Sequence, residues 1–108
     1  MDTFVALADP TRRRIIESLA AGECSFGTLA EKFEISRPAV SQHLKVLRDA
    51  GIVTSRPDAQ RRIYRLSDDG LDTVDRWLKD VRKFWSGRLD RLDLALSHDR
   101  HEEEKTDE

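Results

Sequence analysis

The sequence predicts a mostly α-helical fold that contains one small β-hairpin and ends in a long helix. Three observations lead to this prediction. Apolar residues recur at helical spacing through most of residues 2–51. Between residues 52 and 66, two short stretches of strand-forming residues flank a turn, a pattern typical of a hairpin. From residue 68 onward, apolar residues return at alternating steps of three and four, which favours one long helix.

The first third of the chain is expected to form three short helices. Asp2–Ala8 is the first helix. Asp9 caps the second, which begins with a proline suited to a first helical position and ends near Ala20. Gly22–Cys24 is interpreted as a linker. Ser25 caps the third helix, whose apolar face consists of Phe26, Leu29, Ala30 and Phe33.

Three consecutive arginines, Arg12, Arg13 and Arg14, lie in the first turn of the second helix. The helix dipole makes positive charge unfavourable at this end. The side chains either contact phosphate, pair with acids elsewhere or form a solvated surface, and the sequence leaves these alternatives open.

Ser36–Gly51 has the pattern of an amphipathic helix with well-defined ends. The Ser36 side chain can cap the helix, Pro38 falls in the first turn where a missing N–H costs little, and Gly51 suits the left-handed residue that ends a helix. Its apolar stripe consists of Val40, Leu44 and Leu47. The other face carries side chains able to contact base edges and phosphates: Arg37, Ser41, Gln42, Lys45 and Arg48.

A tight turn, Glu34–Ser36, joins the third helix to this one. Two helices joined in this way, the second basic and exposed at its start, are typical of a DNA-binding helix-turn-helix. The alternative is an ordinary helix with a solvated polar face. Charge favours the DNA interpretation, because Ser36–Arg65 contains seven basic and two acidic residues, a net charge of +5, although the whole chain carries −2.

Ile52–Arg56 and Arg62–Leu66 are expected to be antiparallel strands joined by the turn Pro57–Arg61. A hairpin beside a recognition helix is a wing, so the order of elements predicts a winged helix-turn-helix. Arg61 and Arg62 at its tip are expected to enter a minor groove or contact phosphates. The alternative is that they only keep the hairpin soluble.

The long helix is expected at about residues 68–97, capped by Ser67-Asp68-Asp69, whose acids suit a helix N-terminus. Its apolar seam is roughly 40 Å long at 1.5 Å per residue, and a chain of 108 residues has little core left to cover it. We therefore expect a homodimer, the alternative being burial within one chain. The expected interface consists of Phe4, Leu71, Val74, Leu78, Val81, Trp85, Leu89 and Leu92. Residues 98–108 contain no apolar side chain and are expected to be a disordered acidic tail beyond a single 1–97 domain.

Composition narrows the class of protein. Cys24 is the only cysteine, and no leader or bilayer-spanning stretch is evident, so a cytoplasmic protein without membrane association is expected. The chain has no glycine-rich phosphate loop and no cluster of titratable residues at catalytic spacing, which argues against an enzyme. Cys24 is interpreted as either a redox-sensitive thiol before a helix or a buried, inert one.

Two motifs, A-L-A-D-P-T-R-R-R-I-I at Ala6–Ile16 and S-R-P-A-V-S-Q-H-L-K-V-L-R-D-A-G-I-V at Ser36–Val53, resemble the ArsR family of winged-helix bacterial repressors. The resemblance covers roughly residues 3–97. It implies a homodimer that binds double-stranded DNA at a palindromic operator and represses transcription, often of its own operon. The DNA-binding set expected on this basis is Ser36, Arg37, Pro38, Ser41, Gln42, Lys45, Arg61 and Arg62.

Many members of the family sense metals, and here the sequence departs from their pattern. A paired C-x-C site is replaced by G-E-C-S-F with Cys24 alone, and the last helix has no histidine before His98. His98 and His101 with Glu102 have a spacing that is better explained as incidental. We expect no metal site and no cofactor, and the effector is unknown. The alternative function is a redox-, ligand- or metal-gated sensor of the same fold.

Overall fold

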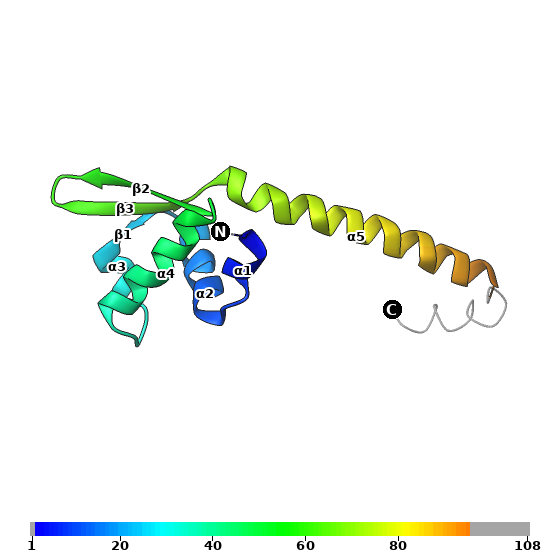
Figure 1. The fold of residues 1–108 in the computed structure, drawn as a ribbon, viewed down its shortest axis with the longest axis horizontal. Coiled ribbons are helices and arrows are strands. Elements are labelled where there is room, and N and C mark those ends of the chain that lie inside the picture. Colours follow the sequence, from blue (N-terminus) through cyan, green and yellow to red (C-terminus); the bar gives the residue numbers. More distant parts are fainter. Residues whose placement is uncertain (1, 96–108) are drawn as a thin grey trace. The chain divides into compact units, whose positions relative to one another are not determined.

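The computed structural model describes residues 2–95, with side chains described up to residue 87. It divides into two units, one that ends at Val74 and one that begins at Asp75. The predicted mostly helical fold with a small hairpin and a long last helix is confirmed (Figure 1). The elements are α1 Thr3–Leu7, α2 Pro10–Ala20, β1 Cys24–Ser25, α3 Phe26–Glu31, α4 Arg37–Asp49, β2 Val53–Asp58, β3 Arg61–Leu66 and α5 Asp68–Ala95.

The helix starts follow the local sequence. Asp9 caps α2 by accepting a hydrogen bond from the Arg12 backbone N–H at 3.0 Å. Ser25 caps α3 and Ser36 caps α4, each with its hydroxyl 3.2 Å from the backbone nitrogen three residues on. The three predicted caps are therefore confirmed, and each satisfies an N–H that the helix itself leaves free.

The sheet is larger than the predicted hairpin. β1 pairs antiparallel with β3, so that the strand order is β1-β3-β2 (Figure 1). The prediction that Gly22–Cys24 is only a linker was wrong at Cys24, which lies opposite Tyr64. A strand of two residues is too short to show an alternating pattern, so only its pairing with β3 reveals it.

The turn of the hairpin is shorter than predicted. β2 continues to Asp58 and β3 begins at Arg61, so the turn between them is Ala59–Gln60 instead of Pro57–Arg61. β2 is an edge strand, which tolerates Pro57 because the missing N–H need not serve a further strand. Ala59 takes the left-handed conformation, with φ of 57°, to close this tight turn.

The core of the first unit lies where the helices and the sheet meet. The predicted stripe of α4, Val40, Leu44 and Leu47, is completely buried. It packs with residues of α2, α3, the strands and the segment before β2: Ile15, Leu19, Leu29, Ala30, Ile52, Val53 and Tyr64. Burial of this stripe fixes which face of α4 remains outside.

Arg12 and Arg13 have partners that the sequence did not indicate. Arg12 Nε donates to the Ala6 carbonyl at 2.7 Å and Nη2 donates to the Val5 carbonyl at 3.3 Å. Arg13 Nη1 donates to the Leu7 carbonyl at 3.0 Å. The guanidinium groups, whose charge is unfavourable at the start of α2, therefore lie at the C-terminal carbonyls of α1, where positive charge is favourable.

The start of α5 is held closely against the end of α4. Gly51 ends α4 with φ of 77°, as predicted. The Ser67 N–H donates to the Ile52 carbonyl at 2.8 Å, and Gly70 is buried against the Gly51–Ile52 backbone. Leu71, which we expect at a dimer interface, packs partly against the core of its own chain.

The second unit consists of α5 from Asp75 onward. Large apolar side chains on it are exposed, among them Leu78, Val81 and Phe84, the last with 65% of its surface accessible. Within the described residues, no helix is both long and apolar enough to cross a membrane. The predicted tail, with His98 and His101, and the side chains of Leu89 and Leu92 lie outside what the structure describes.

Candidate nucleic-acid interface

The outer face of α4 is polar and open to solvent. Because the apolar stripe faces the core, the predicted DNA-contacting side chains lie on the exposed side: Ser36, Arg37, Pro38, Ser41, Gln42 and Lys45. The first turn contains no acidic residue. The helix dipole makes this end of α4 favourable for anions.

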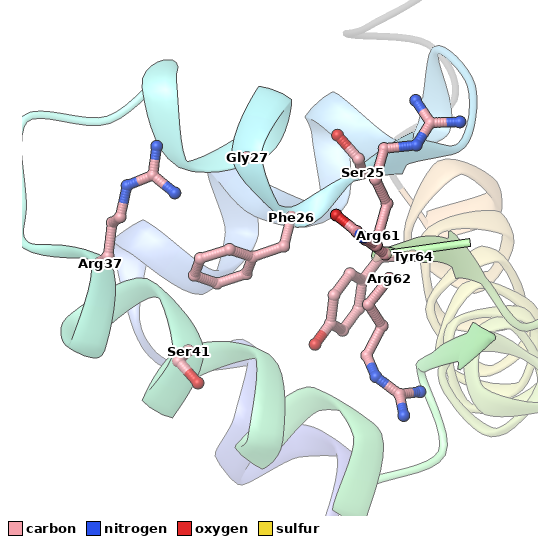
Figure 2. Close-up of a pocket in the computed structure, with 9 residues that line it drawn as sticks. Ser25, Phe26, Gly27, Arg37, Ser41, Arg61, Arg62 and Tyr64 are labelled. Atoms are coloured by element: carbon pink, nitrogen blue, oxygen red, sulfur yellow. The ribbon is translucent and has the colours of Figure 1, made fainter. Parts of the chain in front are cut away.

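A groove of about 520 Å³ runs between the start of α4 and the wing (Figure 2). The structure places four predicted site residues along it: Arg37, Ser41, Arg61 and Arg62. The other predicted residues of α4 are exposed but do not line it. The remaining walls are formed by Ser25, Phe26, Gly27, Gln60 and Tyr64, which contribute no carboxylate. The lining therefore combines three guanidinium groups with polar and aromatic side chains.

The wing arginines have local partners and leave further donors open. Arg61 Nη2 lies 3.0 Å from the Asp58 carboxylate, and Arg62 Nη1 donates to the Ser55 hydroxyl at 3.2 Å. A guanidinium has five N–H donors, so each side chain can bind another acceptor. Figure 2 shows the two guanidinium groups pointing in opposite directions from β3, which spreads the positive charge across the wing.

Five residues of the groove were not predicted as site residues: Ser25, Phe26, Gly27, Gln60 and Tyr64. Phe26 and Tyr64 were identified only as structural residues, and their ring centroids lie 6.4 Å apart. The alternation of side chains along a strand was the available signal, since it places Tyr64 on the same face of β3 as Arg62.

A small polar cluster supports α4 from behind. His43 Nδ1 lies 3.4 Å from Arg12 Nη1 and 3.9 Å from the Asp9 carboxylate. The backbone N–H of Arg12 holds the pKa of Asp9 below its ordinary value, and the neighbouring positive charge acts in the same direction. His43 is thus half-buried between α4 and α2, away from the exposed face.

A further ion pair joins the wing to the segment before β1. Arg56 on β2 donates to the carboxylate of Glu23, which precedes β1. This hydrogen bond raises the pKa of Arg56 above its already high ordinary value. Cys24 beside it is half-buried. In the part of the chain that the structure describes, no cluster of three His, Cys, Asp or Glu residues could hold a metal ion.

Known proteins resemble this chain in sequence and in fold. The profile of a family described as bacterial regulatory protein, arsR family, matches residues 9–55. The chain is 49% identical over 84 residues to the HTH-type transcriptional regulator Rv2034 of Mycobacterium tuberculosis, an alignment that covers 78% of this chain and 76% of that one. The chain belongs to the ArsR family of DNA-binding transcriptional regulators. The predicted family is thereby confirmed.

Other relatives agree with this assignment. This ArsR-family chain is 35% identical over 77 residues to the transcriptional repressor SdpR of Bacillus subtilis, covering 71% of this chain and 86% of that one. A crystal structure of a possible transcriptional regulator for arsenical resistance superposes with a TM-score of 0.69 at 45% identity, covering 88% of this chain and 96% of the other. These relatives are regulators and repressors, not enzymes, and they support the winged helix-turn-helix fold.

Proposed function

We propose that this ArsR-family protein is a homodimeric, sequence-specific repressor that binds a palindromic operator. In this proposal α4 enters the major groove while the wing contacts the adjacent backbone or minor groove. One observation carries it: Arg37 and Ser41 of α4 and Arg61 and Arg62 of the wing line the same exposed groove. An interface that combines a recognition helix with cationic flanks suits duplex DNA.

The residues of α4 divide into two kinds of contact. Arg37 and Gln42 are assigned to base edges, because guanidinium pairs bidentately with guanine and a carboxamide with adenine. Ser36, Ser41 and Lys45 are assigned to phosphates, which fix the register of the helix without reading sequence. Pro38 keeps the first turn compact beside these contacts.

The proposed dimer uses α5. Leu78, Val81 and Phe84 are 38%, 39% and 65% exposed, an apolar surface unusual for a helix that faces only water. A two-fold dimer would present two copies of α4 to half-sites about one helical turn, roughly 34 Å, apart. Bound across a promoter in the cytoplasm, including that of its own gene, it would block RNA polymerase.

The proposal is tested by fluorescence anisotropy with the DNA upstream of the gene and a scrambled duplex of equal length, over a salt series. We expect tighter binding to the native fragment and a steep salt dependence. Arg37→Ala and Gln42→Ala should each lose about 5-fold to 100-fold in affinity for the native fragment and reduce the preference over scrambled DNA. Arg61→Ala should weaken both duplexes alike and lower the salt slope by about one.

Lys79→Ala is the matched charge control, because Lys79 is exposed on α5 and ion-paired with Asp75 at 2.9 Å. It should bind both duplexes like the unmodified protein. Normal binding by Arg37→Ala and Arg61→Ala together would show that this surface is wrongly assigned. Absence of binding at low salt would reject the DNA-binding proposal itself. Sedimentation equilibrium of Phe84→Glu tests the dimer, which this substitution should weaken.

A further inference from the structure

We infer that the hydroxyl of Tyr64 binds a phosphate of the DNA backbone within the groove between α4 and the wing. The inference rests on the proposed function and adds to its contacts a residue of the wing that carries no charge. It begins from an unusual position: Tyr64 is 94% buried, since only 6% of its surface is exposed, yet it lines the groove.

The hydroxyl of Tyr64 is open to solvent and has no internal partner in the part of the chain that the structure describes. No hydrogen bond to this hydroxyl is found among the described residues. No buried side-chain nitrogen or oxygen in that same part of the chain lacks a partner, so the Tyr64 oxygen must be reached by solvent. Figure 2 shows it pointing into the groove, between Ser41 and Arg62. A donor kept at a nearly buried position without an internal partner is available for a ligand.

The ring that carries the hydroxyl is held from several sides. Tyr64 lies on the central strand, opposite Cys24 of β1 and Ser55 of β2. Its ring packs against Phe26 at the start of α3, with an interplanar angle of 52°. The position of the hydroxyl oxygen is therefore set before any ligand arrives, which lowers the entropy lost on binding.

The surroundings of the hydroxyl favour phosphate over other acceptors. Arg37 and Arg62 line the same groove, and none of its lining residues is acidic. Tyrosine is among the side chains that donate to DNA phosphates, and a donor fixed between cations matches an anionic oxygen. Since Ser41 of α4 lines the same groove, a duplex held by α4 would bring its backbone within reach of Tyr64.

Tyr64→Phe tests this inference in the full-length protein, because it removes only the oxygen and keeps the ring. We expect about tenfold weaker binding to the native upstream fragment and to the scrambled duplex, as is typical for loss of a hydrogen bond to a charged group. The preference for the native fragment and the salt slope should not change, because no cation is removed. The thermal midpoint should not fall, because the hydroxyl makes no internal hydrogen bond.

Thr54→Val is the matched control. It removes one hydroxyl from β2, and Thr54 lies opposite Arg65, on the face of the hairpin away from Tyr64. Its DNA affinity should equal that of the unmodified protein. Affinity of Tyr64→Phe within twofold of the unmodified protein would overturn the inference while leaving the proposed function intact. Loss on the native fragment alone, or loss with a lower thermal midpoint, would also overturn it, in favour of a base contact or a structural role.

Discussion

Gly70 is the position where the fold tolerates a side chain least. A Cβ atom built there lies 2.0 Å from the Gly51 carbonyl oxygen and 2.5 Å from the Cα of Ile52. Ordinary contact begins at 3.4 Å, so Gly70→Ala requires the two backbone segments to separate by about 1.4 Å. Both are constrained, since Ile52 is fully buried and its carbonyl accepts the Ser67 N–H at 2.8 Å.

The cost of Gly70→Ala can be assigned to named terms. Overpacking against rigid backbone is expected at the upper end of its usual range, about 3 kcal/mol. Weakening the Ser67–Ile52 hydrogen bond adds about 1 kcal/mol. Alanine favours helix over glycine by at most about 1 kcal/mol, which partly offsets these terms. The net loss of about 3 kcal/mol corresponds to a thermal midpoint about 10–20 °C lower for a domain of this size.

Thermal and urea unfolding followed by circular dichroism, at one fixed protein concentration, measure this loss. Gly87→Ala is the control, because Gly87 lies in the same helix and its added Cβ meets no atom within 4 Å. That variant should unfold at the unmodified temperature or slightly above it. A Gly70→Ala protein as stable as Gly87→Ala would refute the reasoning, because the close approach of α5 to Gly51 would then impose no constraint.

Three further substitutions test contacts made elsewhere in the first unit. Arg12→Met should lower the free energy of unfolding by about 2 kcal/mol in urea denaturation, because the carbonyls of α1 lose charged donors. Asp9→Asn keeps the cap but removes the titration. The pKa of Asp9 is lowered in the folded state, so its ionised carboxylate stabilises the fold above about pH 4 and this stabilisation is lost below it. The unmodified protein should therefore lose stability relative to Asp9→Asn on acidification. Ala59→Gly should raise stability by about 0.5 kcal/mol in thermal unfolding, because glycine adopts the positive φ of the turn without strain.

Each of these predictions has a contradicting result. Unchanged stability of Arg12→Met would mean that water hydrogen-bonds to the α1 carbonyls as well as Arg12 does. Arg14→Met is the control, because Arg14 is exposed in the same helix. Parallel acid unfolding of Asp9→Asn and the unmodified protein would show that the lowered pKa of Asp9 has no effect on folding. A less stable Ala59→Gly would indicate that chain entropy outweighs strain at this turn.

Features that depend on neighbours in sequence were predictable. The caps at Asp9, Ser25 and Ser36 need only a short polar side chain before a helical pattern, and the structure has all three. The buried stripe of α4 follows from helical periodicity, and the same periodicity identifies its exposed polar face. The candidate recognition surface on α4 was predictable because one helix alone defines it.

Features that depend on distant neighbours were not predictable. β1 is assigned by pairing with a strand about forty residues later, and nothing around Cys24 indicates that pairing. Arg12 and Arg13 of α2 donate to carbonyls of the preceding helix. Predicting these hydrogen bonds would require the packing of α1 against α2. Gly70 resembles any glycine near a helix start, and only the approach of Gly51 gives it a role.

The groove depends both on local sequence pattern and on contacts between distant residues. The register of the hairpin decides which side chains of the wing share a face. A turn at Pro57–Arg61, as predicted, would set Arg56 opposite Arg62, whereas the observed turn sets Arg56 opposite Ile63. A slip of one residue reverses the face of every side chain on one strand relative to the other. In the observed register Ser55 lies opposite Tyr64 and accepts a hydrogen bond from Arg62, so β2 holds an arginine that lines the groove. The two-residue turn that fixes this register requires a positive φ at Ala59, where the sequence has neither glycine nor asparagine to signal it.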